Sequence, residues 1–230
     1  MKTIGLLAAF GPVAGAHFYM RLLQLVDAKS DADYPGIVLL SRPDIPDRID
    51  FLLHDGPSPV PYYVEMVQQL NALRVDLVGI ASATSHAFLA DVQRASNAPT
   101  VNLLAAVGAE AARQGARRVG LLATSASVRL HLYEPYLPEG CALVCPPDVA
   151  QAELDRIIYA VKRGESAETL APRLSALVDE PWAEGVETYI LGCTELPLVA
   201  QELAKHHRTI DSVECLARAL LDAADIPALA

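Results

Sequence analysis

One cysteine of this 230-residue sequence lies where a thiol could take part in proton transfer. Cys193 directly follows the apolar run Tyr189–Gly192, and Thr194 and Glu195 come next. The apolar run predicts a buried strand that ends at the cysteine. Backbone N–H groups at a strand-to-helix turn bind anions and lower the pKa of a thiol. Cys193 is therefore a candidate acid or base, although a free cysteine is more often a small buried hydrophobic residue.

A second polar turn follows a similar apolar run in the first half of the chain. Leu77–Ala81 predicts a buried strand, and Ser82-Ala83-Thr84-Ser85-His86 follows it directly. A serine hydroxyl is a much weaker acid than a thiol. Ser82 would therefore need a neighbour such as His86 to act as a base. A capping or buried structural role is the alternative for His86.

The two turns belong to a long-range repeat. Residues 4–8 resemble residues 119–123, residues 75–82 resemble residues 186–193, and residues 100–102 resemble residues 209–211. Short apolar strands can resemble one another by chance, but three pairs in the same order favour a duplication. We therefore predict two similar lobes, residues 1–105 and 106–230, with approximate boundaries and with terminal elements that can be exchanged between them.

The rest of the pattern predicts an α/β protein. Buried strands are expected at residues 3–8, 36–40, 77–81, 100–103, 119–123, 143–145 and 189–192. Amphipathic helices are expected at residues 15–28, 61–73, 88–96, 107–115, 154–164, 167–183, 198–206 and 213–224. Apolar strands separated by helices indicate parallel sheets with helices on both faces. Ligands bind beyond the carboxyl ends of such strands, so duplicated lobes would bring two matching strand ends to one cleft.

The composition limits the function classes. Hydrophobic residues make up 52% of the chain and charged residues 20%, which excludes an intrinsically disordered protein. The net charge of −10 argues against a nucleic-acid partner, because such binding relies on clustered Lys and Arg. Four irregularly spaced cysteines form no disulfide framework or zinc motif, so a reducing cytoplasm is expected. No apolar run is long enough for a membrane span, and no dinucleotide motif is present.

The N-terminus loosely resembles a secretion signal. The apolar run Ile4–Phe10 is followed by Ala14-Gly15-Ala16, which resembles a cleavage site. Only Lys2 supplies a charge before the run, Pro12 interrupts the pattern, and the same apolar motif recurs in mid-chain. These features favour a buried strand over a signal peptide.

Taken together, the motifs resemble the cofactor-independent aspartate/glutamate racemase superfamily. The resemblance covers nearly the whole chain and rests on Ile4-Gly5-Leu6, Gly11-Pro12, Ile45-Pro46-Asp47-Arg48, Ser82–His86, Val119–Thr124 and Gly192-Cys193-Thr194-Glu195. It implies two pseudo-symmetric α/β lobes with the active site between them. It also implies racemisation of aspartate or glutamate by two cysteines, one on each face of the substrate α-carbon, without pyridoxal phosphate or a metal. A homodimer is the assembly that the resemblance suggests.

The sequence departs from the family at the first cysteine. Ser82-Ala83 stands where the family has Cys-Asn, so Cys193 would serve one face and the Ser82 region the other. Three outcomes stay open. The protein racemises an acidic amino acid slowly or asymmetrically, it acts as a single-cysteine decarboxylase or isomerase of a related dicarboxylate, or it binds a small carboxylate without catalysis.

The resemblance also assigns supporting roles. Arg48 would clamp the distal carboxylate of an acidic substrate, which suits a planar guanidinium, unless it is a surface residue paired with a neighbouring aspartate. Lys162 would close over the substrate, although lysine is common near helix C-termini. His86 and Glu195 are expected to support the reaction. Hydroxyls and turn N–H groups would hold the other carboxylate, with simple helix capping as the alternative; these residues are Thr84, Ser85, Thr124, Ser127 and Thr194.

Overall fold

The chain forms two compact units, which the computed structural model describes over residues 1–8 and 11–229. The first unit consists of Met1–Leu103 together with Val213–Ala230, and the second of Leu104–Ser212. The predicted boundary after residue 105 lies close to Leu103, where the chain first passes from one unit to the other. The chain passes back after Ser212, so the last helix belongs to the first unit. The division after residue 105 stays a prediction about folding domains.

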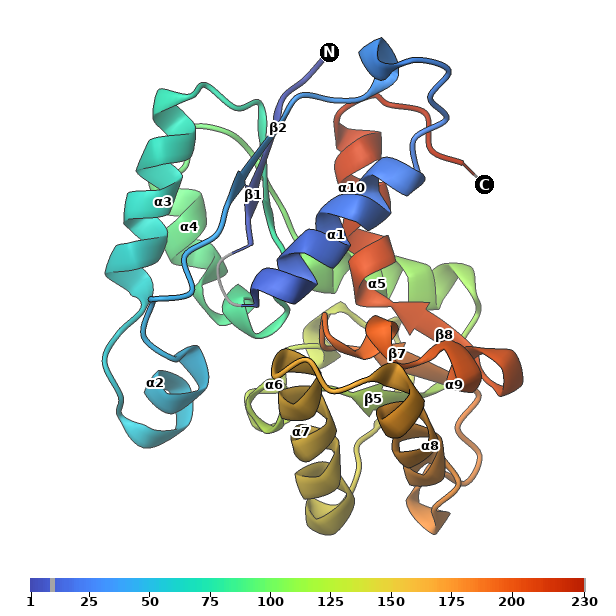
Figure 1. Cartoon of the computed structure of the whole chain (residues 1–230). Coiled ribbons are helices and arrows are strands. Elements are labelled where there is room, and N and C mark those ends of the chain that lie inside the picture. Colours follow the sequence, from blue (N-terminus) through green and yellow to red (C-terminus); the bar gives the residue numbers. More distant parts are fainter. Residues whose placement is uncertain (9–10, 230) are drawn as a thin grey trace. The chain divides into compact units, whose positions relative to one another are not determined.

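A four-stranded parallel sheet forms the centre of the first unit (Figure 1). Its strands lie in the order β2-β1-β3-β4, and Ile4 pairs with both Ile37 and Leu77. The strands are β1 (Ile4–Leu7), β2 (Ile37–Leu40), β3 (Leu77–Ile80) and β4 (Thr100–Val101). β1 and β3 are buried throughout, as their uninterrupted apolar sequences predict.

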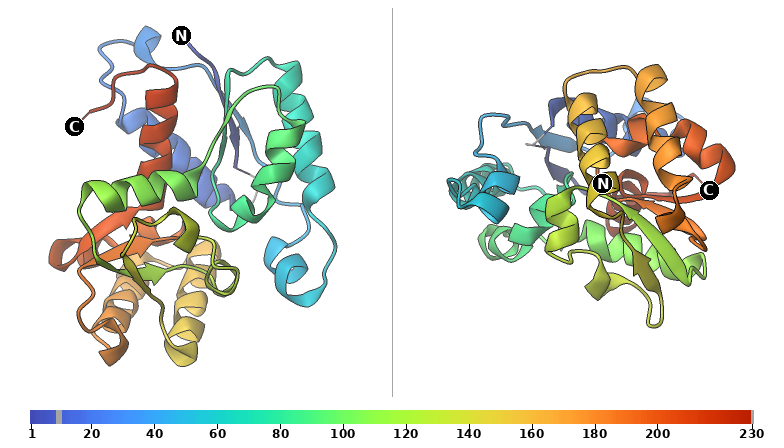
Figure 2. Two further views of the ribbon diagram at one scale, coloured as in Figure 1. Left: turned by 180° about the vertical axis from the view of Figure 1, so that it is seen from behind. Right: turned by 90° about the horizontal axis from the view of Figure 1, so that it is seen from below.

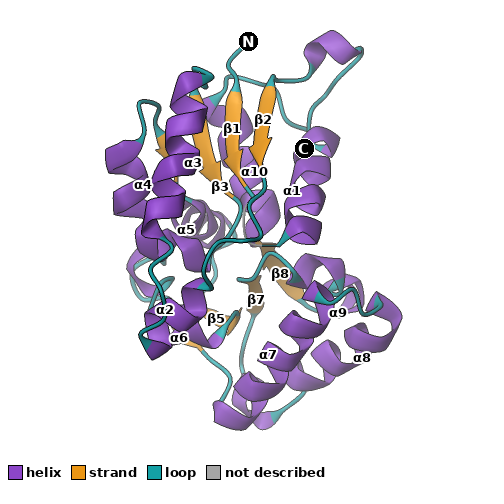
Figure 3. Ribbon diagram, turned by 60° about the vertical axis from the view of Figure 1, so that its left-hand side comes forward, coloured by secondary structure: helices purple, strands orange, loops and turns teal. Residues whose placement is uncertain are grey.

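Helices cover both faces of this sheet. α3 and α4 lie on one face, and α1 and α10 lie on the other (Figures 1 and 3). The buried side chains of α3 pack with those of β1 and β3 in one apolar core. The helices of this unit are α1 (Pro12–Gln24), α2 (Arg48–His54), α3 (Val60–Ala72), α4 (Leu89–Ala95) and α10 (Ser212–Ala223).

The second unit repeats the plan. Its sheet has the order β6-β5-β7-β8, again parallel, with β5 (Arg118–Leu122), β6 (Ala142–Val144), β7 (Thr188–Leu191) and β8 (Arg208–Asp211). One face packs against α7, α8 and α9, while α5 lies on the other side (Figures 1 and 2). Its helices are α5 (Leu103–Arg113), α6 (Ser125–Arg129), α7 (Asp148–Lys162), α8 (Ala167–Val178) and α9 (Gln201–His206).

The identical strand orders explain the repeat in the sequence. The matched segments are β1 with β5, β3 with β7, and β4 with β8, and each pair occupies the same place in its sheet. The predicted α/β class, with two parallel sheets flanked by helices, is therefore confirmed. In the part of the chain that the structure describes, no helix has the length and apolar character needed to cross a membrane.

Several element predictions were wrong in detail. The predicted helix at 167–183 ends at Val178, and the predicted helix at 15–28 runs from Pro12 to Gln24. β8, α2 and α6 were missed because β8 is an edge strand with polar positions and the two helices span only one or two turns. Ala9 and Phe10, at the end of the apolar N-terminal run, lie outside the described residues.

Candidate active site

The carboxyl ends of β5 and β7 place two polar turns beside each other in the second unit. Leu122 pairs with Leu191, and the N–H of Gly192 donates to the Leu122 carbonyl at 2.7 Å. The residues that follow each strand therefore leave the sheet at the same edge. Thr124 follows β5 and Cys193 follows β7, and both side chains are buried.

Cys193 is hydrogen-bonded to a buried carboxylate. Its thiol donates to Glu195 Oε2 at a sulfur–oxygen distance of 2.9 Å. The Thr194 hydroxyl donates to the same oxygen at 3.3 Å, and Lys162 Nζ lies 3.9 Å from Glu195 Oε1. Lys162 is the last residue of α7, as its sequence position predicts. The cluster thus joins a thiol, a carboxylate that can accept its proton, and a cation that balances the carboxylate charge.

The pKa of the Cys193 thiol is raised, which is opposite to the direction expected from its turn. Burial is the largest cause, and the negative charge of Glu195 adds to it, while Lys162 acts in the other direction. The expected helix N-terminus is absent because only the three-residue 3₁₀ turn Leu196–Leu198 follows. The expectation of a lowered thiol pKa was therefore wrong for this ligand-free site, in which the thiol is protonated at neutral pH.

The turn after β5 presents two buried hydroxyls. Thr124 caps α6 by accepting from the N–H of Ser127 at 3.3 Å, and the two hydroxyl oxygens lie 3.1 Å apart. Two residues of α7 hold this turn. Asp155 accepts from the N–H of Ser125 at 3.1 Å and from its hydroxyl, and Gln151 donates to the Ala123 carbonyl at 2.9 Å. The capping alternative is thus realised, and the hydroxyls still lie at the strand end.

A tyrosine fixes the turn that carries Cys193. The buried hydroxyl of Tyr133 donates to the Gly192 carbonyl at 2.8 Å. A Cβ at Gly192 would lie 2.9 Å from Leu121 Cδ1 and 3.0 Å from Tyr133 Oη. A side chain at position 192 would therefore have to displace Leu121 and the tyrosine hydroxyl that holds the turn.

In the first unit, the turn after β3 is held by His86. Its Nε2 accepts from the N–H of Leu103 at 3.0 Å, so Nδ1 carries the proton and donates to the Ser82 carbonyl at 2.9 Å. Burial lowers the pKa of His86 to about 4, and the backbone carbonyl bonds only partly oppose it. Both ring nitrogens therefore bind backbone groups, and neither is directed at the Ser82 hydroxyl. The turn itself is the 3₁₀ segment Thr84–Phe88.

Arg48 lies close to the same turn. It begins α2, whose N-terminus is capped by Asp47, and it is only 6% exposed, so it is not the surface arginine that was the alternative. The charge of Arg48 and the nearby Ser85 hydroxyl both lower the pKa of Tyr63, which burial raises more strongly. Arg48, Tyr63 and Ser85 therefore form one buried polar cluster.

The structure groups the predicted residues by unit. The first unit holds Arg48, Ser82, Thr84, Ser85 and His86, and the second holds Thr124, Ser127, Lys162, Cys193, Thr194 and Glu195. Sequence reasoning missed Tyr63, Tyr133, Gln151 and Asp155, which act through contacts between distant segments. Of these, only Gln151 and Asp155 could have been noticed in the sequence, because their four-residue spacing places them on the same face of a helix. Within residues 1–8 and 11–229, no three His, Cys, Asp or Glu side chains are grouped so that they could hold a metal ion.

Known proteins share both the sequence pattern and the fold. Residues 7–220 match the family described as Asp/Glu/hydantoin racemase. The structure is similar to the aspartate racemase of Picrophilus torridus, with a TM-score of 0.91 and 26% identity over 100% of this chain and 96% of that chain. It is also similar to an aspartate racemase homologue from Pyrococcus horikoshii, with a TM-score of 0.76 and 28% identity over 98% and 100% of the two chains.

Similarity to curated sequences is more limited in length. A glutamate racemase from a Synechococcus species is 30% identical over 162 residues, which cover 68% of this chain and 59% of that protein. The chain thus spans somewhat more than half the length of the first curated relatives that it matches.

Proposed function

The chain belongs to the Asp/Glu/hydantoin racemase family, and from this premise we propose that it is a cofactor-independent racemase of an acidic amino acid, aspartate or glutamate. The observation that carries the proposal is the buried Cys193–Glu195 pair at the end of β7. Such a pair can move a proton to and from an α-carbon without an added cofactor. The proposal also includes a cytoplasmic location.

Cys193 can serve the reaction in both directions. As an acid, the thiol gives its proton to the α-carbanion, and Lys162 offsets the negative charge of the thiolate and Glu195 that remain. As a base, the thiol first passes its proton to Glu195, and the thiolate then takes the α-proton of the substrate. The raised thiol pKa favours the protonated form before substrate binds, so the resting site is ready to act as the acid.

The substrate carboxylates need cations and hydrogen-bond donors. We assign the side-chain carboxylate to Arg48, because a buried guanidinium binds a carboxylate strongly and with two parallel hydrogen bonds. The α-carboxylate is assigned to Lys162 and to the hydroxyls of the polar turns, which are Thr84, Ser85, Thr124, Ser127 and Thr194. These donors would also stabilise the negative charge that develops on the substrate when the α-proton leaves.

Ser82 is the weak member of a two-sided mechanism. In the proposed racemase it exchanges a proton on the face opposite Cys193. His86 gives it no help as a base, because both imidazole nitrogens are bound to backbone groups. This observation favours a second candidate, in which Cys193 alone protonates or deprotonates a related dicarboxylate. Stereospecific decarboxylation of a substituted malonate is such a reaction.

One assay in D₂O tests these candidates. The protein is incubated without pyridoxal phosphate, and with EDTA, with each enantiomer of aspartate and glutamate and with substituted malonates. Deuterium at the α-carbon together with inversion supports the racemase. Exchange without inversion, or release of CO₂ from malonates, supports chemistry at Cys193 alone. No reaction with any substrate would leave only a protein that binds small carboxylates.

Three variants sharpen the result. Cys193→Ser should abolish exchange, whereas Cys141→Ser changes a cysteine outside the site and should leave it intact. Ser82→Cys should raise the rate of inversion by at least about tenfold, because a thiol is a stronger acid than a hydroxyl and forms its conjugate base far more readily near neutral pH. An unchanged rate in Ser82→Cys would mean that the turn after β3 does not act on the substrate α-carbon.

A further inference from the structure

The chain crosses between the two units at equivalent places in the fold. It leaves the first unit after Leu103 and returns to it after Ser212. Each crossing follows the last strand of a sheet, β4 or β8, and lies at the start of a helix. As a result, α5 follows the first sheet but belongs to the second unit. In the same way, α10 follows the second sheet but belongs to the first.

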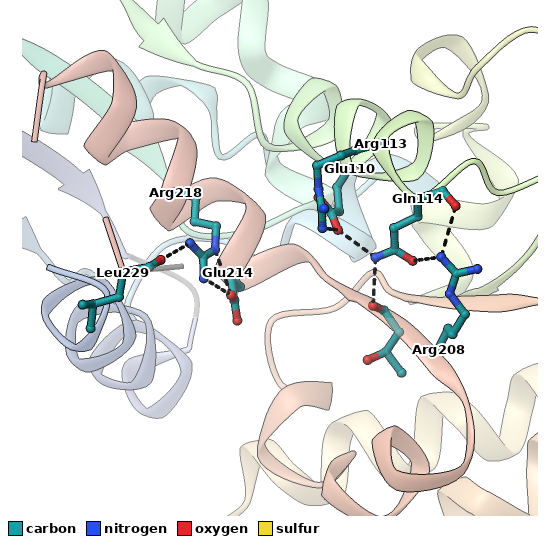
Figure 4. A network of polar contacts seen from close by, with 8 residues as sticks. Glu110, Arg113, Gln114, Arg208, Glu214, Arg218 and Leu229 are labelled. Atoms are coloured by element: carbon teal, nitrogen blue, oxygen red, sulfur yellow. Dashed lines mark hydrogen bonds and ion pairs between the residues drawn. The ribbon is translucent and has the colours of Figure 1, made fainter. Parts of the chain in front are cut away.

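Polar contacts hold α5 and α10, the two exchanged helices, within the units to which they belong. Arg208 in β8 donates to the carbonyl of Gln114, just beyond α5, at 3.1 Å. Glu214 in α10 forms an ion pair with Arg21 in α1 at 2.5 Å. Figure 4 shows the groups around Gln114 and around Glu214. Each helix is thus anchored in its unit, and the crossings lie at their N-terminal ends.

The first crossing is hydrogen-bonded to the turn that carries Ser82. The N–H of Leu103, the last residue of the first unit, donates to Nε2 of His86, and Nδ1 of the same ring donates to the Ser82 carbonyl. The imidazole therefore bridges the turn and the crossing. It is 6% exposed, so water does not compete for either bond.

The second crossing is hydrogen-bonded to the strand that leads to Cys193. Ser212, the last residue of the second unit, donates from its hydroxyl to the Leu191 carbonyl at 2.7 Å. Leu191 ends β7, two positions before Cys193. The serine side chain is completely buried. In both units a side chain thus links the crossing to the segment that carries a candidate reactive residue, through an imidazole in the first unit and a hydroxyl in the second.

We propose that His86 and Ser212 are positioning residues for catalysis, each of which fixes a reactive turn relative to the crossing through which the chain leaves its unit. The proposal rests on the proposed function. Both covalent connections between the units are hydrogen-bonded to the segments that carry Ser82 and Cys193, so a change at a crossing moves a reacting side chain. A displacement of about 1 Å is enough to slow a reaction greatly.

The alternative is that both hydrogen bonds serve stability alone. His86 accepts from the N–H of Leu103 at the start of α5, where the first N–H groups lack partners within the helix, and Ser212 ties the start of α10 to β7. Loss of such a bond lowers stability and leaves the reaction of the folded protein unchanged. Kinetic constants of fully folded variants therefore separate the two roles.

The first test compares variants of Ser212, whose hydroxyl binds the Leu191 carbonyl, with a variant of Ser166, whose hydroxyl caps a helix. Ser212→Ala should lower kcat about tenfold and leave KM nearly unchanged, because the misplaced thiol affects the transition state more than binding. Ser212→Thr keeps the hydroxyl and should recover most of kcat. Ser166→Ala removes the hydroxyl that caps α8 and should lower stability without changing kcat.

The histidine is tested with a matched pair. His86→Gln keeps an acceptor that can reach the N–H of Leu103, whereas the shorter side chain of His86→Asn keeps only a donor for the Ser82 carbonyl. We expect a higher kcat in the Gln variant than in the Asn variant. Equal kcat values in two folded variants would show that the bond to Leu103 plays no part in catalysis.

A second measurement does not depend on the reaction. The rate of Cys193 alkylation by iodoacetamide, followed on its peptide by mass spectrometry, should rise several-fold in Ser212→Ala and stay at the wild-type value in Ser166→Ala. A wild-type protein without activity would overturn the proposed function, and alkylation would still report on the positioning of Cys193. If kcat and the alkylation rate are both unchanged in folded Ser212→Ala, the serine contributes only to stability and the proposal is wrong.

Discussion

At the scale of single residues, the site depends on where the protons lie before substrate binds. Burial and the negative charge of Glu195 raise the pKa of Cys193, and Lys162 opposes them. The thiol is thus stored in its protonated form beside a carboxylate that can accept the proton. In the reaction that we propose, this arrangement favours proton donation first and requires Glu195 whenever Cys193 acts as a base.

Glu195→Gln should separate the acidity of the Cys193 thiol from the rate at which it exchanges the substrate α-proton. Removal of the carboxylate charge should lower the pKa of Cys193, so alkylation by iodoacetamide should follow a pH profile shifted to lower pH. Exchange of the substrate α-proton should nevertheless fall about 100-fold, because the proton acceptor is lost. Alkylation rates between pH 6 and 10 and α-deuteration in D₂O measure the two effects.

The matched control is Glu202→Gln, since Glu202 is an exposed carboxylate that also lies beside a lysine, Lys205. It should change neither the alkylation profile nor the exchange rate. Full exchange activity in Glu195→Gln, together with an unshifted alkylation profile, would remove Glu195 from the mechanism.

The places of the candidate residues, in polar turns at the ends of buried strands, could be predicted from the sequence, but their protonation and hydrogen bonds could not. Cys193, Glu195 and Arg48 stand in recognisable motifs at strand or helix ends. The pKa direction of Cys193 depends on how much protein covers it, and the role of His86 depends on a partner in a different element, Leu103. Both result from packing between distant segments, which a motif does not specify.

At the scale of elements, the turn after β3 makes stability depend on pH. Burial lowers the pKa of His86 from 6.5 to about 4, so between these values the unfolded chain binds a proton that the folded chain does not. The contribution of neutral His86 to the free energy of unfolding is therefore fully present above about pH 6.5 and is lost as the pH drops toward 4. The full pKa shift corresponds to about 3 kcal/mol. Burial also lowers the pKa of His17, which acts in the same direction.

Urea unfolding at pH 7 and at pH 4.5 measures this loss. His86→Gln cannot be protonated and should show a smaller decrease between the two pH values than the wild type. His131→Gln, which changes an exposed histidine beside Glu134, should behave as the wild type does. An equal decrease in all three proteins would mean that His86 is not the group responsible.

The elements themselves were predictable in proportion to their burial. β3 and β7 are buried at every position, and their apolar runs identify them directly. β8 is an edge strand with polar positions, and α2 is a short helix whose cap, Asp47, is its main local signal. Such elements are stabilised by their surroundings more than by their own sequences.

At the scale of the whole molecule, the exchanged helices prevent a simple division of the chain. A fragment of residues 1–105 lacks α10, which buries Val213, Leu216, Leu220 and Leu221 completely. Leu220 occupies the space beside Gly79 in β3. Burial of four such side chains contributes on the order of 10 kcal/mol, which is comparable to the stability of a whole domain. We expect this fragment to be unfolded by circular dichroism.

A rearranged chain provides the control. Lys2 Nζ binds the Ala223 carbonyl at 2.7 Å, so the first and last segments of this unit lie side by side. A chain in which residues 213–230 precede residues 1–103 through a short Gly/Ser linker should therefore fold and unfold cooperatively in urea. Cooperative unfolding of residues 1–105 alone would show that α10 is dispensable to the first unit.

The charge of the whole molecule opposes the substrate that we propose. A protein of net charge −10 repels an acidic amino acid, and this repulsion is screened when ionic strength rises from about 0.01 M to about 0.1 M. The local attraction of Arg48 is screened in the same range, so the two effects oppose each other and kcat/KM of the wild type should vary little with salt.

Arg48→Gln should remove the attraction for the side-chain carboxylate and leave that of Lys162 together with the repulsion of the whole molecule. Its kcat/KM for aspartate or glutamate should be low at every ionic strength and should rise as salt is added, because the repulsion, which now outweighs the remaining attraction, is screened. Arg94→Gln alters the net charge equally at an exposed site and should keep the weak salt dependence of the wild type. A kcat/KM of Arg48→Gln that falls with added salt would mean that cations other than Arg48 attract the substrate to this acidic protein.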